Sequence, residues 1–296
     1  MLALLVAGAA CSSVPKQQPP AALAPCDRLD LPVAVAGEPP PAVMQDVAAA
    51  NTEYVLGVPG DKPEVLKQAT VGVPRLVGGG LWLTRAEGAA EVEEVNGLSC
   101  HRIAPGDLLE VSPHGKEIAA SLNPQTQVLL DSSGRRLAKL APQVIAWFAD
   151  DRAVAINGTT VRVYSGGHAS TVPHDSAVQI IATLGSDRLV ETKARSTQLM
   201  TLTGQVSPLI DELLQPAAGS PDGRYVAGLD PYVDRLLLVD AGSGKSATLP
   251  NPGGVLSVRW SADSQWLAVV GRYGGSVIHI PDGRAISLGS LNVLSW

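Results

Sequence analysis

At residues 220–227 the chain reads Ser-Pro-Asp-Gly-Arg-Tyr-Val-Ala, and this segment is the clearest copy of a repeated unit. Two further copies read Ser-Pro-His-Gly-Lys-Glu-Ile-Ala at 112–119 and Ser-Ala-Asp-Ser-Gln-Trp-Leu-Ala at 261–268. Weaker copies occupy 149–154 and 186–190. Each begins with residues that pre-set or tolerate turn dihedrals and continues as an apolar run. The unit therefore predicts a tight turn that leads into a β-strand.

The copies recur at a nearly constant spacing. They begin at residues 112, 149, 186, 220 and 261, so successive differences are 37, 37, 34 and 41 residues. An apolar run also precedes the turn, as at 255–260, and a third run, a second turn and a short fourth run follow it, as at 235–249. This pattern predicts four short antiparallel strands per unit. The other predicted third strands are 126–130, 160–164, 198–202 and 276–280.

Four short strands in a unit of about 40 residues are typical of a β-propeller blade. The copy at 220–227 resembles the repeat of TolB-like and WD40-like propellers, and the resemblance extends from about residue 75 to the end of the sequence. The Trp-Asp dipeptide of WD40 repeats is absent, so the TolB-like group is the more similar. The resemblance implies an all-β propeller and a role in cell-envelope protein complexes. A pair of β-sandwiches is the alternative fold.

The ends of the repeat predict how the ring closes. Gly78-Gly79-Gly80 followed by Leu81-Trp82-Leu83 is a turn and then a strand at the expected place. Residues 291–296 imitate 256–260, and Trp296 lies 36 residues after Trp260. Residues 291–296 thus form an inner strand, which needs partners for its backbone groups. We expect three N-terminal strands to supply them, and hence seven four-stranded blades with a closing blade shared by both termini. Six blades are the alternative. The three expected N-terminal strands are 31–36, 52–58 and 64–71.

The N-terminal segment predicts export. Residues 1–10 are apolar, end in small residues and are too few to span a bilayer, which typifies a signal peptide. Because Cys11 follows directly, the segment resembles a bacterial lipoprotein signal, which implies that Cys11 carries lipid. A conventional signal peptide with an incidental Cys11 is the alternative. Residues 11–25 are a Pro-rich tether and 26–296 the propeller, held on the outer, periplasmic or extracellular side of a membrane.

The remaining cysteines predict a cross-link. With Cys11 lipidated, Cys26 and Cys100 form an even pair in an oxidising compartment. We expect a disulfide between them that joins the seam of the ring. Two free, buried thiols are the alternative.

No pattern predicts catalysis, a metal or a cofactor. Gly244-Lys245-Ser246 looks like the end of a phosphate-binding loop, but the required earlier glycine is Val239, so we interpret it as a turn. His168, His174 and Asp175 are the only cluster that contains histidines. A net charge of −6 argues against nucleic-acid binding.

We therefore expect a non-enzymatic, membrane-tethered module that binds or assembles cell-envelope proteins. Candidate residues of its binding face are Tyr232, Arg272 and Tyr273, because exposed Tyr and Arg often anchor interfaces. One alternative is an enzyme of lactonase or hydrolase type with a metal in the propeller channel. Another is a sensor or regulatory ectodomain of a membrane protein complex.

Overall fold

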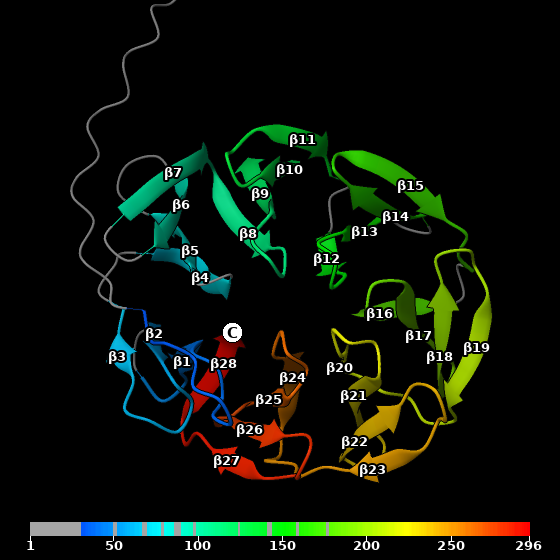
Figure 1. The fold of residues 1–296 in the computed structure, drawn as a ribbon. Helices are drawn as coiled ribbons and strands as arrows, with labels where there is room; N and C mark the ends of the chain where they lie inside the picture. The colour runs from blue at the N-terminus through cyan, green and yellow to red at the C-terminus, as the bar shows by residue number, and fades with distance from the viewer. Residues whose placement is uncertain are drawn as a thin grey trace, which may run out of the picture.

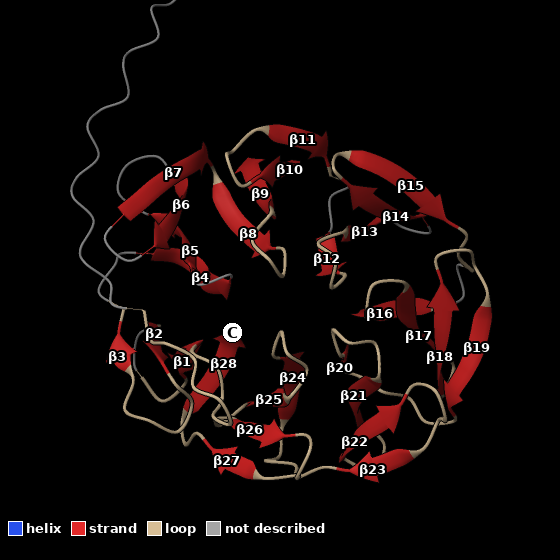
Figure 2. Cartoon of the chain, viewed as in Figure 1, coloured by secondary structure: helices blue, strands red, loops and turns tan. Residues whose placement is uncertain are grey.

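The computed structural model describes residues 31–49, 52–66, 70–77, 80–85, 90–96, 99–123, 125–140, 144–157, 160–175 and 178–296. These residues form seven four-stranded antiparallel sheets arranged as a ring, with no helix among them (Figures 1 and 2). The predicted all-β propeller with seven blades is confirmed. In the part of the chain so described, no helix is long and apolar enough to cross a membrane.

Six blades are continuous in sequence, and in each of them the strands follow one another across the sheet. Their bounds are β4–β7 (Thr70–Val77, Gly80–Arg85, Glu91–Asn96, Ser99–Pro105), β8–β11 (Asp107–Val111, Glu117–Asn123, Thr126–Asp131, Arg136–Lys139), β12–β15 (Val144–Trp147, Ala153–Asn157, Thr160–Ser165, His168–Val172), β16–β19 (Gln179–Leu184, Arg188–Lys193, Ser196–Thr201, Val206–Ile210), β20–β23 (Ala217–Gly219, Tyr225–Asp230, Arg235–Asp240, Ser246–Thr248) and β24–β27 (Val255–Trp260, Trp266–Gly271, Ser276–His279, Ala285–Ser287).

The seventh blade combines the two ends of the chain. Its order is β28-β1-β2-β3, and β28 (Leu291–Ser295) pairs antiparallel with β1 (Ala42–Asp46). The outer strands are β2 (Glu53–Gly57) and β3 (Glu64–Val65). The blade shared by the termini is thus confirmed, and so is the inner position of the strand that imitates 256–260.

Two of the expected N-terminal strands are placed wrongly. Residues 31–36 form no strand: Pro32 lacks an N–H donor, and Val33 and Val35 are exposed. The strand lies instead at 42–46, directly after three prolines, because Val43 and Met44 can be buried there. The expected strand 64–71 belongs to two blades, since its first two residues form β3 and its last two begin β4.

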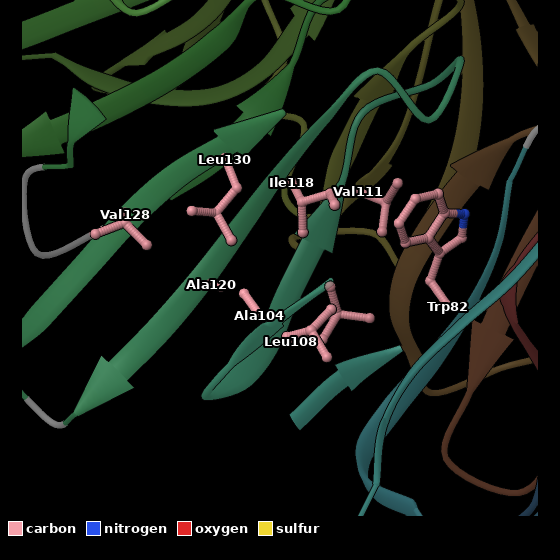
Figure 3. Packing of buried hydrophobic residues seen from close by; sticks show 9 residues of the cluster. Trp82, Ala104, Leu108, Val111, Ile118, Ala120, Val128 and Leu130 are labelled. Atoms are coloured by element: carbon pink, nitrogen blue, oxygen red, sulfur yellow. The ribbon is translucent and has the colours of Figure 1, made fainter. Parts of the chain in front are cut away.

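The blades adhere through apolar clusters between their faces. Trp82 of one blade packs with Val111, Ile118 and Leu130 of the next (Figure 3). The closing blade packs on both neighbours, since Met44 contacts the cluster of Trp266 and Val43 contacts that of Leu81. Burying one such side chain contributes about 1.5–3 kcal/mol. The apolar side chains that alternate along each strand therefore also hold neighbouring blades together.

The repeated unit forms the turn between the first two strands of a blade. The Ser220 hydroxyl donates to Oδ1 of Asp222 (2.5 Å) and accepts the N–H of Tyr225 (2.9 Å). Gly223 has a φ of +76°, which glycine adopts without strain. Ser261 makes the same pair of bonds with Asp263 and Trp266. We call the side of the ring that carries these turns the motif face.

The opposite side carries the turns between the second and third strands, because successive hairpins of an antiparallel sheet alternate between its ends. We call it the loop face. Its turns include those between β17 and β18, between β21 and β22, and between β25 and β26, on three consecutive blades.

Candidate functional site

The structure brings the three candidate binding residues to one side of the ring. Tyr232 lies in the turn between β21 and β22, and Arg272 and Tyr273 lie in the turn between β25 and β26. Both turns belong to the loop face, on neighbouring blades. Tyr232 is 61% exposed and Tyr273 is 79% exposed. Their shared location is a finding, whereas their role in binding stays a prediction.

Each turn is held by its own hydrogen bonds. The buried carboxylate of Asp230 accepts the N–H of Tyr232 (3.0 Å), and the N–H of Arg272 donates to the carbonyl of Gly254 (3.0 Å). Gly274 has a φ of +129°, and a Cβ there would stand 1.7 Å from the carbonyl oxygen of Gly289. The tyrosines therefore project from turns whose backbone is constrained.

Further exposed side chains surround the candidates. Val233 is 62% exposed beside Tyr232, and Leu256 is 56% exposed near the start of β24, beside the turn of Tyr273. The guanidinium of Arg195, in the turn between β17 and β18, lies 4.9 Å from the centre of the Tyr232 ring. We call these residues together the loop-face patch: Arg195, Tyr232, Val233, Leu256, Arg272 and Tyr273.

Sequence reasoning missed three members of this patch. Val233 could have been found, since it follows Tyr232 in a predicted turn. Leu256 belongs to a strand of alternating apolar and polar residues, and the packing of the neighbouring blade decides which of its side chains are exposed. Arg195 lies in a turn of another repeat. Their proximity follows from the order of blades rather than from any local motif.

The histidine cluster is divided by the structure. His168 begins β15 and is exposed, whereas His174 follows that strand and is buried against Glu191. Nε2 of His174 lies 3.9 Å from Oε1 of Glu191, and Gln198 donates to Oε2 (3.1 Å). Burial raises the pKa of Glu191, although the bond from Gln198 lowers it in part. Among the described residues, no group of three or more His, Cys, Asp and Glu side chains is placed to hold a metal ion.

Two further predictions concern residues that the structure does not fully describe. The signal peptide 1–10, the tether with Cys11, and Cys26 lie outside the described residues. Cys100 lies near the start of β7 and packs beside Leu81 and Val95. Its strand continues to Pro105, where this blade ends. Lipidation and the disulfide stay predictions.

The turn interpretation of Gly244-Lys245-Ser246 is confirmed. These residues connect β22 to β23, and the N–H of Gly244 donates to the carbonyl of Asp240 (2.8 Å). No helix follows them, so this is not a phosphate-binding loop.

Comparison with known proteins shows the fold and no family. No family model matches the sequence, and no curated protein matches it. The C-terminal WD40 domain of Sif2 is similar at a TM-score of 0.55 and 12% identity, over 77% of this chain and 74% of that one. TolB from Acinetobacter baumannii gives a TM-score of 0.48 at 16% identity, over 85% of this chain and 64% of that one. The tricorn protease gives 0.37 at 12% identity, and the match spans 80% of this chain but only 28% of the protease. The Sif2 match, together with the ring of seven blades, confirms the resemblance to propeller repeat proteins at the level of the fold.

Proposed function

We propose that this propeller is a non-enzymatic module that binds protein partners of the cell envelope through the loop-face patch. The observation that carries the proposal is the gathering of Tyr232, Val233, Leu256 and Tyr273, each more than half exposed, on two adjacent blades. Exposed apolar and aromatic side chains that lie together mark interaction sites, and tyrosine is enriched among residues that dominate binding energy.

The constrained turns favour binding by a rigid surface. Binding costs less conformational entropy when the side chains at the interface project from a backbone that is already fixed. Arg195 and Arg272 add cationic groups beside the rings, and arginine is the charged residue most enriched at interfaces. The patch therefore suits a protein surface that offers apolar side chains with carboxylates at its rim.

Membrane tethering through Cys11 is part of the proposal. Two acyl chains would anchor the protein stably, since one alone gives only marginal binding. The fifteen residues 11–25 are rich in proline, and an extended Pro-rich chain of that length reaches about 45 Å at roughly 3.1 Å per residue. Such a spacer would let the ring turn its loop face toward a neighbouring envelope protein.

Site-specific photo-cross-linking in intact cells tests the binding face. A photoreactive phenylalanine analogue replaces Tyr273 on the loop face or, as the control, Ser243 in an exposed turn of the motif face. We expect a discrete cross-linked protein from position 273 and none from 243. The analogue placed at position 256 should give the same product. That product should disappear when Tyr232→Ala is introduced as well. Equal products from both faces, or none from the loop face, would overturn the proposal.

Cell fractionation tests the tether separately. The Cys11→Ala variant should move from the membrane to the soluble exported fraction, because it lacks the site of acylation. A variant that stays with the membrane would exclude lipid at Cys11 while leaving the binding face untouched.

A further inference from the structure

At one level of the ring, some of the inner strands carry charged side chains and the others carry short ones. We call the side chains at this level the layer. The strands β28, β4, β8, β12, β16, β20 and β24 surround the centre of the ring (Figure 1). In five of them the penultimate residue occupies the same register position, next to the motif face. These residues are Glu110, Ala146, Thr183, Ala218 and Arg259.

Glu110 is already paired within this layer. Arg75, from the neighbouring inner strand β4, donates from Nε to Oε1 (2.7 Å) and from Nη2 to Oε2 (3.0 Å). Its terminal nitrogens also reach the carbonyls of Val73 and Leu109, each at 3.4 Å. A bidentate pair of this kind uses both oxygens of the carboxylate. Both oxygens of Glu110 are therefore already engaged by Arg75.

Arg259 has no such partner. Its guanidinium makes no hydrogen bond or ion pair with the residues described, and its Nε is buried and unpaired. Burial is the main cause that lowers the pKa of Arg259, while the charge of Glu110 raises it and that of Arg75 lowers it. An arginine stays protonated in spite of such effects. A partly buried cation without a partner is unfavourable, and an anion beside it would relieve that cost.

We propose that this layer is a binding site for a carboxylate group, held in the channel by Arg259 beside the Arg75–Glu110 pair. The guanidinium fork matches the planar geometry of a carboxylate. The three charged side chains sum to one positive charge, which suits a monoanion, and Glu110 would repel the second charge of a phosphate. The equivalent residues of β12 and β20, Ala146 and Ala218, have short uncharged side chains, and Ala218 packs against the apolar cluster shared with the blade of Arg259.

The carboxylate has two possible sources, a free organic acid or the carboxyl terminus of a partner peptide. Either would enter from the motif face, since the layer lies one residue below the turns of that face. The site does not depend on the loop-face patch, which lies at the other end of the channel.

Calorimetric titration of the full chain tests the site and separates the sources. The probes are sodium acetate, a tripeptide with a free carboxyl terminus, its amidated form and inorganic phosphate, all at constant ionic strength. We expect saturable binding of acetate or of the free tripeptide. A response to acetate indicates a free acid, and a response to the free tripeptide alone indicates a peptide terminus.

Two matched variants make the result specific to Arg259. Arg259→Met should weaken carboxylate binding at least about tenfold, as the loss of a charged hydrogen bond predicts. It should still fold, because Arg259 has no partner to lose, and its unfolding temperature checks this. Arg162→Met, at an exposed position of β14, should bind as the parent does. The proposal is overturned by equal binding in Arg259→Met and the parent, by binding of phosphate alone, or by no saturable binding.

Discussion

The backbone N–H of His114 donates a 2.8 Å hydrogen bond to Oδ1 of Asp151, which belongs to the turn of the next blade. The N–H of Asp222 makes the corresponding bond to the hydroxyl of Ser264 (3.0 Å). Asp151 and Ser264 both have positive φ, at 69° and 60°. The repeated unit therefore forms the hairpin of its own blade and also joins that blade to its neighbour.

Because Asp151 joins two blades, removing its carboxylate should lower the stability of the protein markedly. Asp151 is buried and also meets Nζ of Lys116 (3.2 Å) and Nδ1 of His114 (3.1 Å). Asp151→Ala should lower the free energy of unfolding by about 1.5–3 kcal/mol, because charged hydrogen bonds are lost at a strained backbone position. Denaturant unfolding followed by tryptophan fluorescence measures it. Asp187→Ala, in an exposed turn of the same kind, should change stability by at most about 0.5 kcal/mol.

The contribution of the Asp151 carboxylate to stability should also depend on pH. Burial favours the neutral form of Asp151, but hydrogen bonds from His114, Ser112 and Lys116 outweigh it and hold its pKa below the usual 3.8. A lowered pKa stabilises the fold above the unfolded value, and this contribution is lost as the pH falls through the folded value. The stability difference between the parent and Asp151→Ala should therefore shrink below about pH 4. A difference that stays constant down to pH 2 would contradict this account.

The contribution of Glu191 to stability should change with pH in the opposite direction. Its pKa is raised first by burial and further by Asp175, whereas Gln198, His174 and Lys193 lower it in part. The folded state then binds more protons than the unfolded one above pH 4.5, so stability falls as the pH rises through this window. Glu191→Gln should remove that fall and increase the stability at neutral pH.

Unfolding curves between pH 4 and 8 check this prediction. Glu53→Gln, at an exposed position of β2, is the control and should keep the pH profile of the parent. If Glu191→Gln shows the parent's decline in stability with pH, the carboxyl is not the group responsible.

The repeat at 220–227 was sufficient to predict the blades, because each copy forms its turn by local hydrogen bonds. The shared closing blade was predictable from the similarity of Trp296 and Trp260. The strand at 42–46 was not, since three prolines precede it and only burial against two other blades makes it a strand. Tyr232 and Tyr273 could be placed on one face because their turns are equivalent. Arg259 could not be linked to Glu110, because their relation depends on the closed ring.

The predicted disulfide between Cys26 and Cys100 gives a further test. Peptide mapping without reduction should yield a linked pair, and Cys100→Ser should lower the stability by about 2–4 kcal/mol, because the cross-link restricts the unfolded chain. Reduction should destabilise the parent and leave the variant unchanged. Complete alkylation of both thiols in unreduced, unfolded protein would show that the bond does not form.

The closing blade depends on Asn292 of β28, which reaches the end of β25 in the neighbouring blade. Its Oδ1 accepts the N–H of Gly271 (3.0 Å), and its Nδ2 donates to the carbonyl of the same residue (2.7 Å). All these atoms are buried, so Asn292→Ala would leave two backbone groups unpaired at a cost of about 2–4 kcal/mol. Asn251→Ala removes a comparable side-chain bond to the carbonyl of Asp234 (2.8 Å), but at the exposed surface, and should cost less than about 1 kcal/mol. Equal losses in the two variants, measured by denaturant unfolding, would mean that the contact between β28 and β25 does not hold the ring closed.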